Sequence, residues 1–241
     1  MKKNILLILI SISLSCSNQN KNKSNEWINL FDGSSLDGWR AYNGDQMPPG
    51  WKIVDSVLTF NTQQILEQDY DYKGNRDIMY GDEEFENFEL YLEWKIPKGG
   101  NSGIYYHIKE GYGGFADMAP EYQLLDDENY AEIHDYELKD WQLTAADYAM
   151  HVPDTTKKVL YPPGQWNSSR IIFTSNNVEH WLNDKKVLSF IPWTEQWYEK
   201  RNSGKWDNFP DYGKYKKGYI GLQDHGCLLY TSDAADEGLG V

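Results

Sequence analysis

The sequence predicts an all-β fold, a two-sheet antiparallel sandwich of jelly-roll type, from three observations. Apolar and polar residues alternate with a period of two in many short stretches, turn-forming residues separate these stretches, and no segment carries a long helical period. The sequence also lacks an internal repeat and an alternation of strands with helices. Its 241 residues suit one domain of ordinary size, although two small domains remain possible.

The alternation is clearest in residues 88–96, where Leu90, Leu92 and Trp94 fall on one face of a strand while Glu89 and Glu93 fall on the other. One face is therefore expected in the core and the other in solvent. The further predicted strands are 51–54, 57–60, 103–109, 121–125, 170–174, 178–182, 186–190 and 219–224.

Residues 103–109 repeat this pattern, with Ile104, Tyr106 and Ile108 expected inward and Tyr105 and His107 on the opposite face. Gly- and Asn-rich turns at 98–101, 175–177 and 183–184 fit antiparallel hairpins. The stretches 111–119 and 127–164 are longer than ordinary connections, and loops of this size often shape a binding site.

The composition argues against nucleic acid as a partner. The 37 acidic and 23 basic residues give a formal net charge of −14, whereas nucleic-acid binding depends on clustered Lys and Arg. Aromatic residues make up 15% of the chain, which is enough for a large core with rings left over for a polyhydroxylated ligand.

The first residues predict a lipoprotein signal peptide over 1–16. Two lysines precede a short apolar stretch at 5–14, and Cys16 follows a small residue, so Cys16 is the expected lipidation site. An ordinary signal peptide cut nearby is the alternative. Residues 17–25 are polar and are expected to form a flexible tether, and the folded domain is expected over 26–226.

The last residues, 227–241, are interpreted as foreign to the fold. The string CLLYTSDAADE, which begins at Cys227, resembles the translation of a sequencing adapter. A native tail is the alternative. The foreign origin would leave no cysteine for a disulfide within the domain.

The most suggestive stretch for chemistry is 121–126 (EYQLLD), because the period of two places Glu121 and Gln123 side by side on one sheet face. A carboxylate and an amide there could bind sugar hydroxyls, although a solvated strand residue is the simpler interpretation of Glu121. The spacing is similar to the strand-borne E-x-D-x-x-E sites of sandwich-fold glucanases. Here the middle acid is Gln and the last is Asp126, so the usual pair of glutamates is incomplete.

The five histidines form no closely spaced metal motif, so a metal site would need residues from distant strands. His225 and Gln223 lie opposite the core residues of the last predicted strand, and His107 lies on the polar face of its own strand. His134, His151 and His180 are weaker candidates, each expected to be exposed and structural. No nucleophile elbow, P-loop, dinucleotide fingerprint or H-E-x-x-H motif occurs.

Taken together, the motifs resemble the bacterial 3-keto-disaccharide hydrolase domain, which is common in Bacteroidetes lipoproteins. They follow the family order through almost the whole mature chain. The matching stretches are 30–33 (LFDG), 36–39 (LDGW), 88–90 (FEL), 93–95 (EWK), 99–104 (GGNSGI), 120–123 (PEYQ) with Asp126, 164–167 (GQWN), 180–183 (HWLN) and 221–226 (GLQDHG).

The resemblance implies a concanavalin-like jelly roll that cleaves glycosides already oxidised to a ketone at sugar C3. It implies Glu121 or His225 as base or acid, with His107 as an orienting residue or a ligand of a divalent metal ion. Substrate-positioning residues would be Asn101, Gln123, Tyr148, Trp166 and Asp224. The family continues into a final strand that the 227–241 tail replaces, so a missing last strand and an unpaired edge are expected.

A non-catalytic carbohydrate-binding module is the main alternative, and a conventional glycosidase is a third. The expected partner of the enzyme is an oxidised sugar, with the membrane contacted only through the lipid anchor. The tether carries no acidic run, which favours the periplasmic side of the outer membrane.

Overall fold

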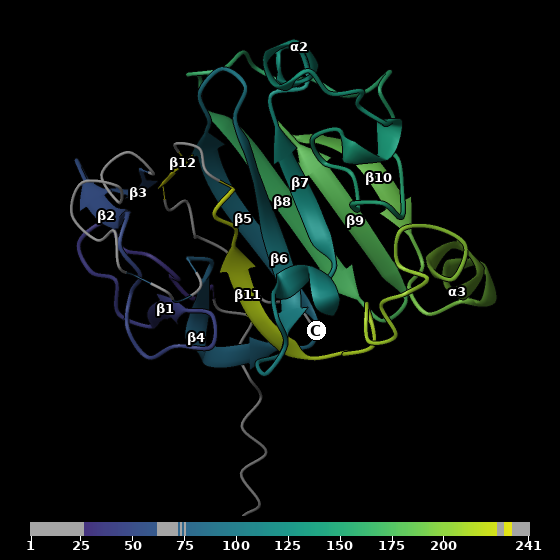
Figure 1. Cartoon of the computed structure of the whole chain (residues 1–241), viewed down its shortest axis with the longest axis horizontal. Coiled ribbons are helices and arrows are strands. Elements are labelled where there is room, and N and C mark those ends of the chain that lie inside the picture. Colours follow the sequence, from purple (N-terminus) through teal and green to yellow (C-terminus); the bar gives the residue numbers. More distant parts are fainter. Residues whose placement is uncertain (1–26, 62–71, 73, 75, 226–228, 233–241) are drawn as a thin grey trace, which may run out of the picture.

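Two antiparallel sheets pack face to face in the computed structural model, which describes residues 27–61, 72, 74, 76–225 and 229–232 (Figure 1). The five-stranded sheet has the order β1 (Trp39–Ala41), β4 (Ile78–Phe85), β11 (Gly218–Leu222), β6 (Asn101–Ile108) and β7 (Glu121–Leu125). The seven-stranded sheet has the order β10 (Lys185–Phe190), β9 (Asn177–Leu182), β8 (Asn167–Thr174), β5 (Phe88–Lys95), β12 (Leu229–Ser232), β3 (Val57–Phe60) and β2 (Trp51–Val54). The predicted two-sheet sandwich is confirmed.

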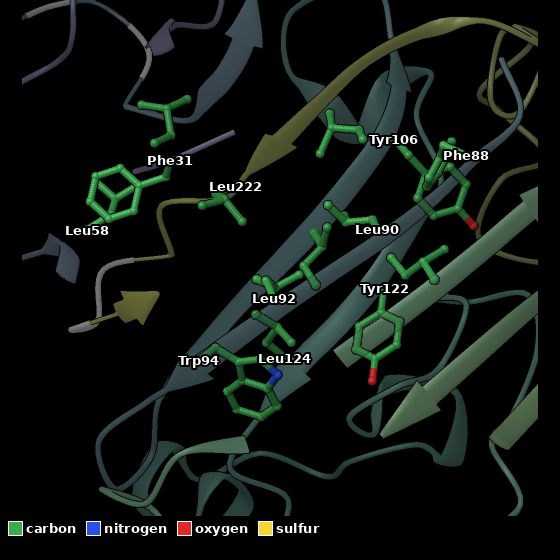
Figure 2. Packing of buried hydrophobic residues seen from close by; sticks show 14 of the residues in the cluster. Phe31, Leu58, Phe88, Leu90, Leu92, Trp94, Tyr106, Tyr122, Leu124 and Leu222 are labelled. Atoms are coloured by element: carbon green, nitrogen blue, oxygen red, sulfur yellow. The ribbon is translucent and has the colours of Figure 1, made fainter. Parts of the chain in front are cut away.

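The core lies between the sheets and follows the predicted alternation. Figure 2 shows the inward side chains of β5, including Leu90, Leu92 and Trp94, close to Tyr122 and Leu124 of the opposite sheet. Trp94 is fully buried, and its indole N–H donates to the Ser169 hydroxyl at 2.8 Å. The two faces pack together because their contact removes the apolar surface of both sheets from water.

The last strand differs from the prediction. Strand β12 pairs with β3 on one side and with β5 on the other, so the place between them is filled and lies inside the sheet. Its sequence, LYTS, includes Tyr and Thr, which favour strands, but four residues are too few to establish a period of two. The expected unpaired edge at this position is therefore wrong. Cys16, the tether and Cys227 lie outside the described residues.

Strands β1 and β4 were not predicted. The first has only three residues, and the second half of β4 is acidic and lacks clean alternation. The long connections contain short helices, which are η1 (Phe115–Asp117), α2 (Tyr130–His134), η2 (Asp140–Gln142) and α3 (Glu195–Arg201). Across the described ranges, no helix is both long enough and apolar enough to span a bilayer.

Candidate active site

Strands β6 and β7 present three alternate residue pairs on the outer face of the five-stranded sheet. The pairs are Asn101 with Leu125, Gly103 with Gln123, and Tyr105 with Glu121. Paired residues of an antiparallel sheet point to the same side, and every second pair shares a face. The middle pair has a glycine on one side, so it leaves room between its neighbours.

The carboxyl group of Glu121 occupies that room. A Cβ atom on Gly103 would lie 2.2 Å from Glu121 Oε1, which is shorter than any normal contact. Tyr105 donates its hydroxyl hydrogen to Glu121 Oε2 at 2.6 Å, and Gln223 Nε2 lies 3.3 Å from the same hydroxyl oxygen. Tyr105 and Glu121 are both buried, with Glu121 only 4% exposed.

Burial raises the pKa of Glu121 to about 7, because a carboxylate loses favourable hydration there. The hydrogen bond from Tyr105 and the positive charge of Lys205 oppose this shift, and the carboxylates of Asp77 and Asp147 add to it. At neutral pH the group is thus present in both protonation states, as proton transfer requires. Burial and the Glu121 charge raise the pKa of Tyr105 well above its usual value, so Tyr105 stays a donor.

The connection after β7 returns to pair along the edge of that strand. The Tyr148 amide donates to the Glu121 carbonyl oxygen, and the Gln123 amide donates to that of Ala146. Residues 127–148 thereby wall a pocket of about 210 Å³ beside Glu121. It is lined by Asn101, Gln123, Leu125, Tyr130, Tyr136, Leu138, Gln142, Tyr148 and His225. This set is called the tyrosine pocket below.

Four of the predicted site residues meet at this pocket: Asn101, Gln123, Tyr148 and His225. Asp224 lies next in sequence to His225, and its backbone amide donates to Asp77 Oδ1 at 2.8 Å. Asp126 is turned away from Glu121, because its Oδ2 accepts from the Gly99 amide at 2.7 Å. The glucanase-type pair of carboxylates therefore does not form from Glu121 and Asp126.

The prediction that His107 shares this face is wrong. His107 has a positive φ of 57°, and a bulge opposite β11 sets Tyr105 against Gly221 but Ile108 against Tyr219. The extra residue turns His107 inward, where its ring meets Phe173 edge-on at 4.4 Å. Its Nε2 lies 2.9 Å from the Glu86 carbonyl oxygen, and burial lowers its pKa to about 4. His107 is thus a neutral core residue.

The prediction that Trp166 belongs to the site is also wrong. Trp166 precedes β8 in the seven-stranded sheet, and Lys95 Nζ lies 4.9 Å from its ring centroid. Lys95 leaves β5 on the face opposite the buried Trp94. The indole therefore lies across the sandwich from Glu121. Of the weaker histidines, His180 is fully buried and not exposed as expected.

Sequence reasoning missed Lys205. It lies in an irregular stretch after α3, where no period or motif marks it. Its Nζ is 4.2 Å from the ring centroid of Tyr148 and 4.8 Å from that of Trp206, and burial lowers its pKa. Tyr105 was placed on the correct face by its period, but nothing linked its hydroxyl to Glu121.

The described part of the chain contains no group of three or more His, Cys, Asp or Glu side chains placed to hold a metal ion. The residues present there do not fit the divalent ion that the resemblance raised. The metal ion stays a prediction.

Known proteins give a consistent comparison. A 3-keto-disaccharide hydrolase of Bacteroides thetaiotaomicron is 35% identical over 222 residues, which cover 83% of this chain and 74% of that protein. A crystal structure of a candidate glycosyl hydrolase from Parabacteroides distasonis is 38% identical with a TM-score of 0.77, covering 90% of this chain and 96% of that one. A second structure from that organism, 24% identical with a TM-score of 0.59, covers 87% and 97% and shows the shared fold alone.

The family model described as the 3-keto-alpha-glucoside-1,2-lyase-like domain matches residues 26–233. This match includes the strands that carry Glu121, Tyr105 and the tyrosine pocket. The chain therefore belongs to the 3-keto-alpha-glucoside-1,2-lyase-like domain family.

Proposed function

We propose that this chain cleaves the glycosidic bond of 3-keto-glycosides by removing the C2 proton, with Glu121 as the base. Its family makes it a glycoside-cleaving hydrolase. The observation that carries the finer proposal is the buried Glu121 carboxyl, whose pKa of about 7 suits a general base at neutral pH.

A ketone at C3 acidifies the neighbouring C2–H bond, so one base of moderate strength is sufficient. Glu121 takes the C2 proton, and the electron pair of that bond forms an enolate with its charge on the C3 oxygen. The enolate then collapses to a C1=C2 double bond and expels the C1 oxygen of the leaving group, which gains a proton. Addition of water returns a hydroxyl to C1 and a proton to C2, so the net change is hydrolysis.

Other residues of the site have roles in this scheme. Lys205 lies near enough to Glu121 to lower its pKa, and its charge would stabilise the enolate oxygen. Tyr105 holds the Glu121 carboxyl through the 2.6 Å hydrogen bond. His225, which lines the tyrosine pocket, would protonate the departing oxygen.

No second nucleophilic carboxylate is needed in this scheme. A retaining glycosidase requires two carboxyl groups about 5–5.5 Å apart. Asp126, the partner that the sequence offered, instead accepts hydrogen bonds from the Gly99 amide and from Asn129. This arrangement supports elimination over the glucanase mechanism.

The test is incubation of the protein with a 3-keto-glucoside and with its unoxidised parent, each with and without a chelator. We expect release of the leaving group from the keto substrate only, and exchange of its C2 hydrogen with deuterated solvent. Equal release from both substrates would contradict the C2 mechanism. Sugar binding without release from either would favour the non-catalytic binding module, and loss of activity with the chelator would support the divalent ion.

The pH dependence follows from the Glu121 pKa. Because the base acts as the carboxylate, the rising limb of the kcat/KM profile should have its midpoint near pH 7. Measurement of kcat/KM between pH 5 and 9 checks this. A rate that falls with pH through that midpoint would make Glu121 the acid, and His225 would then be the candidate base.

The proposed place of this activity is the cell envelope, on the periplasmic side of the outer membrane. The support is the predicted lipoprotein signal peptide over residues 1–16 and the predicted tether over 17–25, which carries no acidic run.

A further inference from the structure

The segment that carries Lys205 has a small core of its own. Its buried members are Met150, Trp197, Trp206 and Tyr212, and none of them belongs to a strand. The indole of Trp206 stacks on the ring of Tyr212, with 4.0 Å between the ring centroids and 8° between the ring planes. Residues 202–213 therefore hold a definite position without a helix or strand of their own.

Arg201, in the last turn of α3, fixes the same segment from its other side. Its Nε donates to the Tyr212 carbonyl oxygen at 3.2 Å, and its Nη2 donates to the Phe209 carbonyl oxygen at 2.7 Å. The Gly213 amide donates to the Met118 carbonyl oxygen at 2.8 Å. The loop is thus attached both to α3 and to the connection that precedes β7.

The Lys205 side chain leaves this loop beside two aromatic rings. Its Nζ lies 4.2 Å from the ring centroid of Tyr148 and 4.8 Å from that of Trp206, within the range in which a ring face attracts a cation. The rings are fixed relative to each other, because Trp206 Nε1 donates to the Tyr148 carbonyl oxygen at 3.2 Å. Lys205 is an exposed residue, so its long side chain would otherwise sample many rotamers.

The two rings place the ammonium beside the proposed base. The Tyr148 amide donates to the Glu121 carbonyl oxygen at 3.0 Å, so the ring that Lys205 contacts belongs to the residue bonded to Glu121. The positive charge of Lys205 lowers the pKa of Glu121, whereas the carboxylates of Asp77 and Asp147 raise it. Contact with the rings and action on the carboxyl therefore agree on where this charge lies.

We propose that Trp206 is a positioning residue for the reaction: together with Tyr148, it holds the Lys205 ammonium where the C3 enolate oxygen develops. This inference rests on the proposed function. Trp206 is 1% exposed, so it acts through Lys205 and not by contact with substrate. A charge held in place beforehand stabilises the enolate without having to reorganise as the enolate forms.

The test measures kcat and KM on a 3-keto-glucoside. Lys205→Met removes the charge and should lower kcat by about 10²-fold. Trp206→Leu keeps the charge but frees it, so kcat should fall by about tenfold with KM within about twofold. Trp206→Phe keeps a ring against Lys205 and should recover most of this loss.

A double-mutant cycle separates positioning from a general loss of packing. In the Lys205→Met background, Trp206→Leu should cost little further activity, because the charge that it positions is already gone. Losses that multiply in full, or a Lys205→Met variant with wild-type kcat, would overturn the proposal. If thermal melting shows that Trp206→Leu fails to fold, Arg201→Gln, which loosens the same loop, takes its place in the cycle with the same expected pattern.

Lys216→Met is the matched control. Lys216 Nζ also lies 4.7 Å from the ring centroid of a tryptophan, but that residue is Trp193, whose ring stacks with that of the buried His107. The control removes a lysine charge and a ring contact of the same kind, and it should leave kcat unchanged.

A titration without substrate separates this inference from the proposed reaction. NMR of the Glu121 carboxyl carbon, assigned by its absence from Glu121→Gln, should give a pKa above the wild-type value of about 7 in both Lys205→Met and Trp206→Leu. Lys216→Met should leave that pKa where it is. Inactivity of the wild type on the keto substrate would contradict the proposed function, while this titration still decides whether Trp206 holds the charge at Glu121. An unchanged Glu121 pKa in Trp206→Leu would overturn the inference.

Discussion

Replacement of Glu121 by Gln should lower kcat for the 3-keto substrate by about 10²- to 10⁴-fold, which is the usual contribution of a positioned general base. The amide keeps the size of the carboxyl and can still accept the Tyr105 hydrogen bond, but it cannot take a proton. The KM should change little, because the site keeps its shape. Steady-state kinetics at pH 8, where the wild-type carboxyl is mostly ionised, measure the effect.

The same variant should fold at least as well as the wild type at that pH. Burial raises the Glu121 pKa from 4.5 to about 7, so the folded state binds more protons than the unfolded state between these values. The unfolding free energy of the wild type therefore falls as pH rises through this window, whereas Gln at this position does not titrate. The melting temperature of Glu121→Gln relative to wild type should increase from pH 5 to pH 8.

Glu93→Gln is the matched control, since Glu93 is also a strand glutamate but leaves β5 on the face away from the core. It should retain wild-type activity. If the kcat of Glu121→Gln stayed within threefold of the wild-type value, the role of Glu121 as base would be wrong. The same variant should also lose the midpoint near pH 7 from the kcat/KM profile, because the titrating carboxyl is gone.

Much of the fold could be predicted because burial of one face of an antiparallel sheet produces an alternation of apolar and polar residues in the sequence. The alternation of Leu90, Leu92 and Trp94 with polar neighbours predicts which face of β5 is buried. The same period correctly places Glu121 and Gln123 on one face of β7. Strand β4 is not predictable from this period because its second half is acidic, and β1 is not because three residues cannot establish a period.

The candidate site was predictable only as far as that period held. One added residue between Tyr105 and Ile108 turns the His107 side chain to the opposite face of β6, and the local alternation of residues does not indicate this bulge. The bulge also requires a glycine on the neighbouring strand, because a Cβ on Gly218 would lie 2.4 Å from the His107 carbonyl carbon. This requirement becomes visible only when the two strands are seen side by side. Lys205 reaches the site from an irregular segment, so its position depends on tertiary packing alone.

Replacement of Gly103 by Ala should abolish most activity while leaving the fold intact. The new methyl group would occupy the position 2.2 Å from Glu121 Oε1, so the carboxyl must move off Tyr105. The backbone of β6 need not move, because the obstructing atoms belong to the end of a side chain and Gly103 has no left-handed conformation. We expect a loss in kcat of about 10²-fold or more, since the base is misplaced.

A double-mutant cycle shows whether this loss acts through Glu121. If Gly103→Ala works by displacing the carboxyl, it should cost little further activity in the Glu121→Gln background, because both changes remove the same base. Additive losses would mean that Gly103 acts by another route, such as direct contact with substrate. Gly114→Ala is the control, because a Cβ there meets nothing within 4 Å and should leave kcat unchanged. The hollow at Gly103 is thus the feature of β6 on which the position of the Glu121 carboxyl depends.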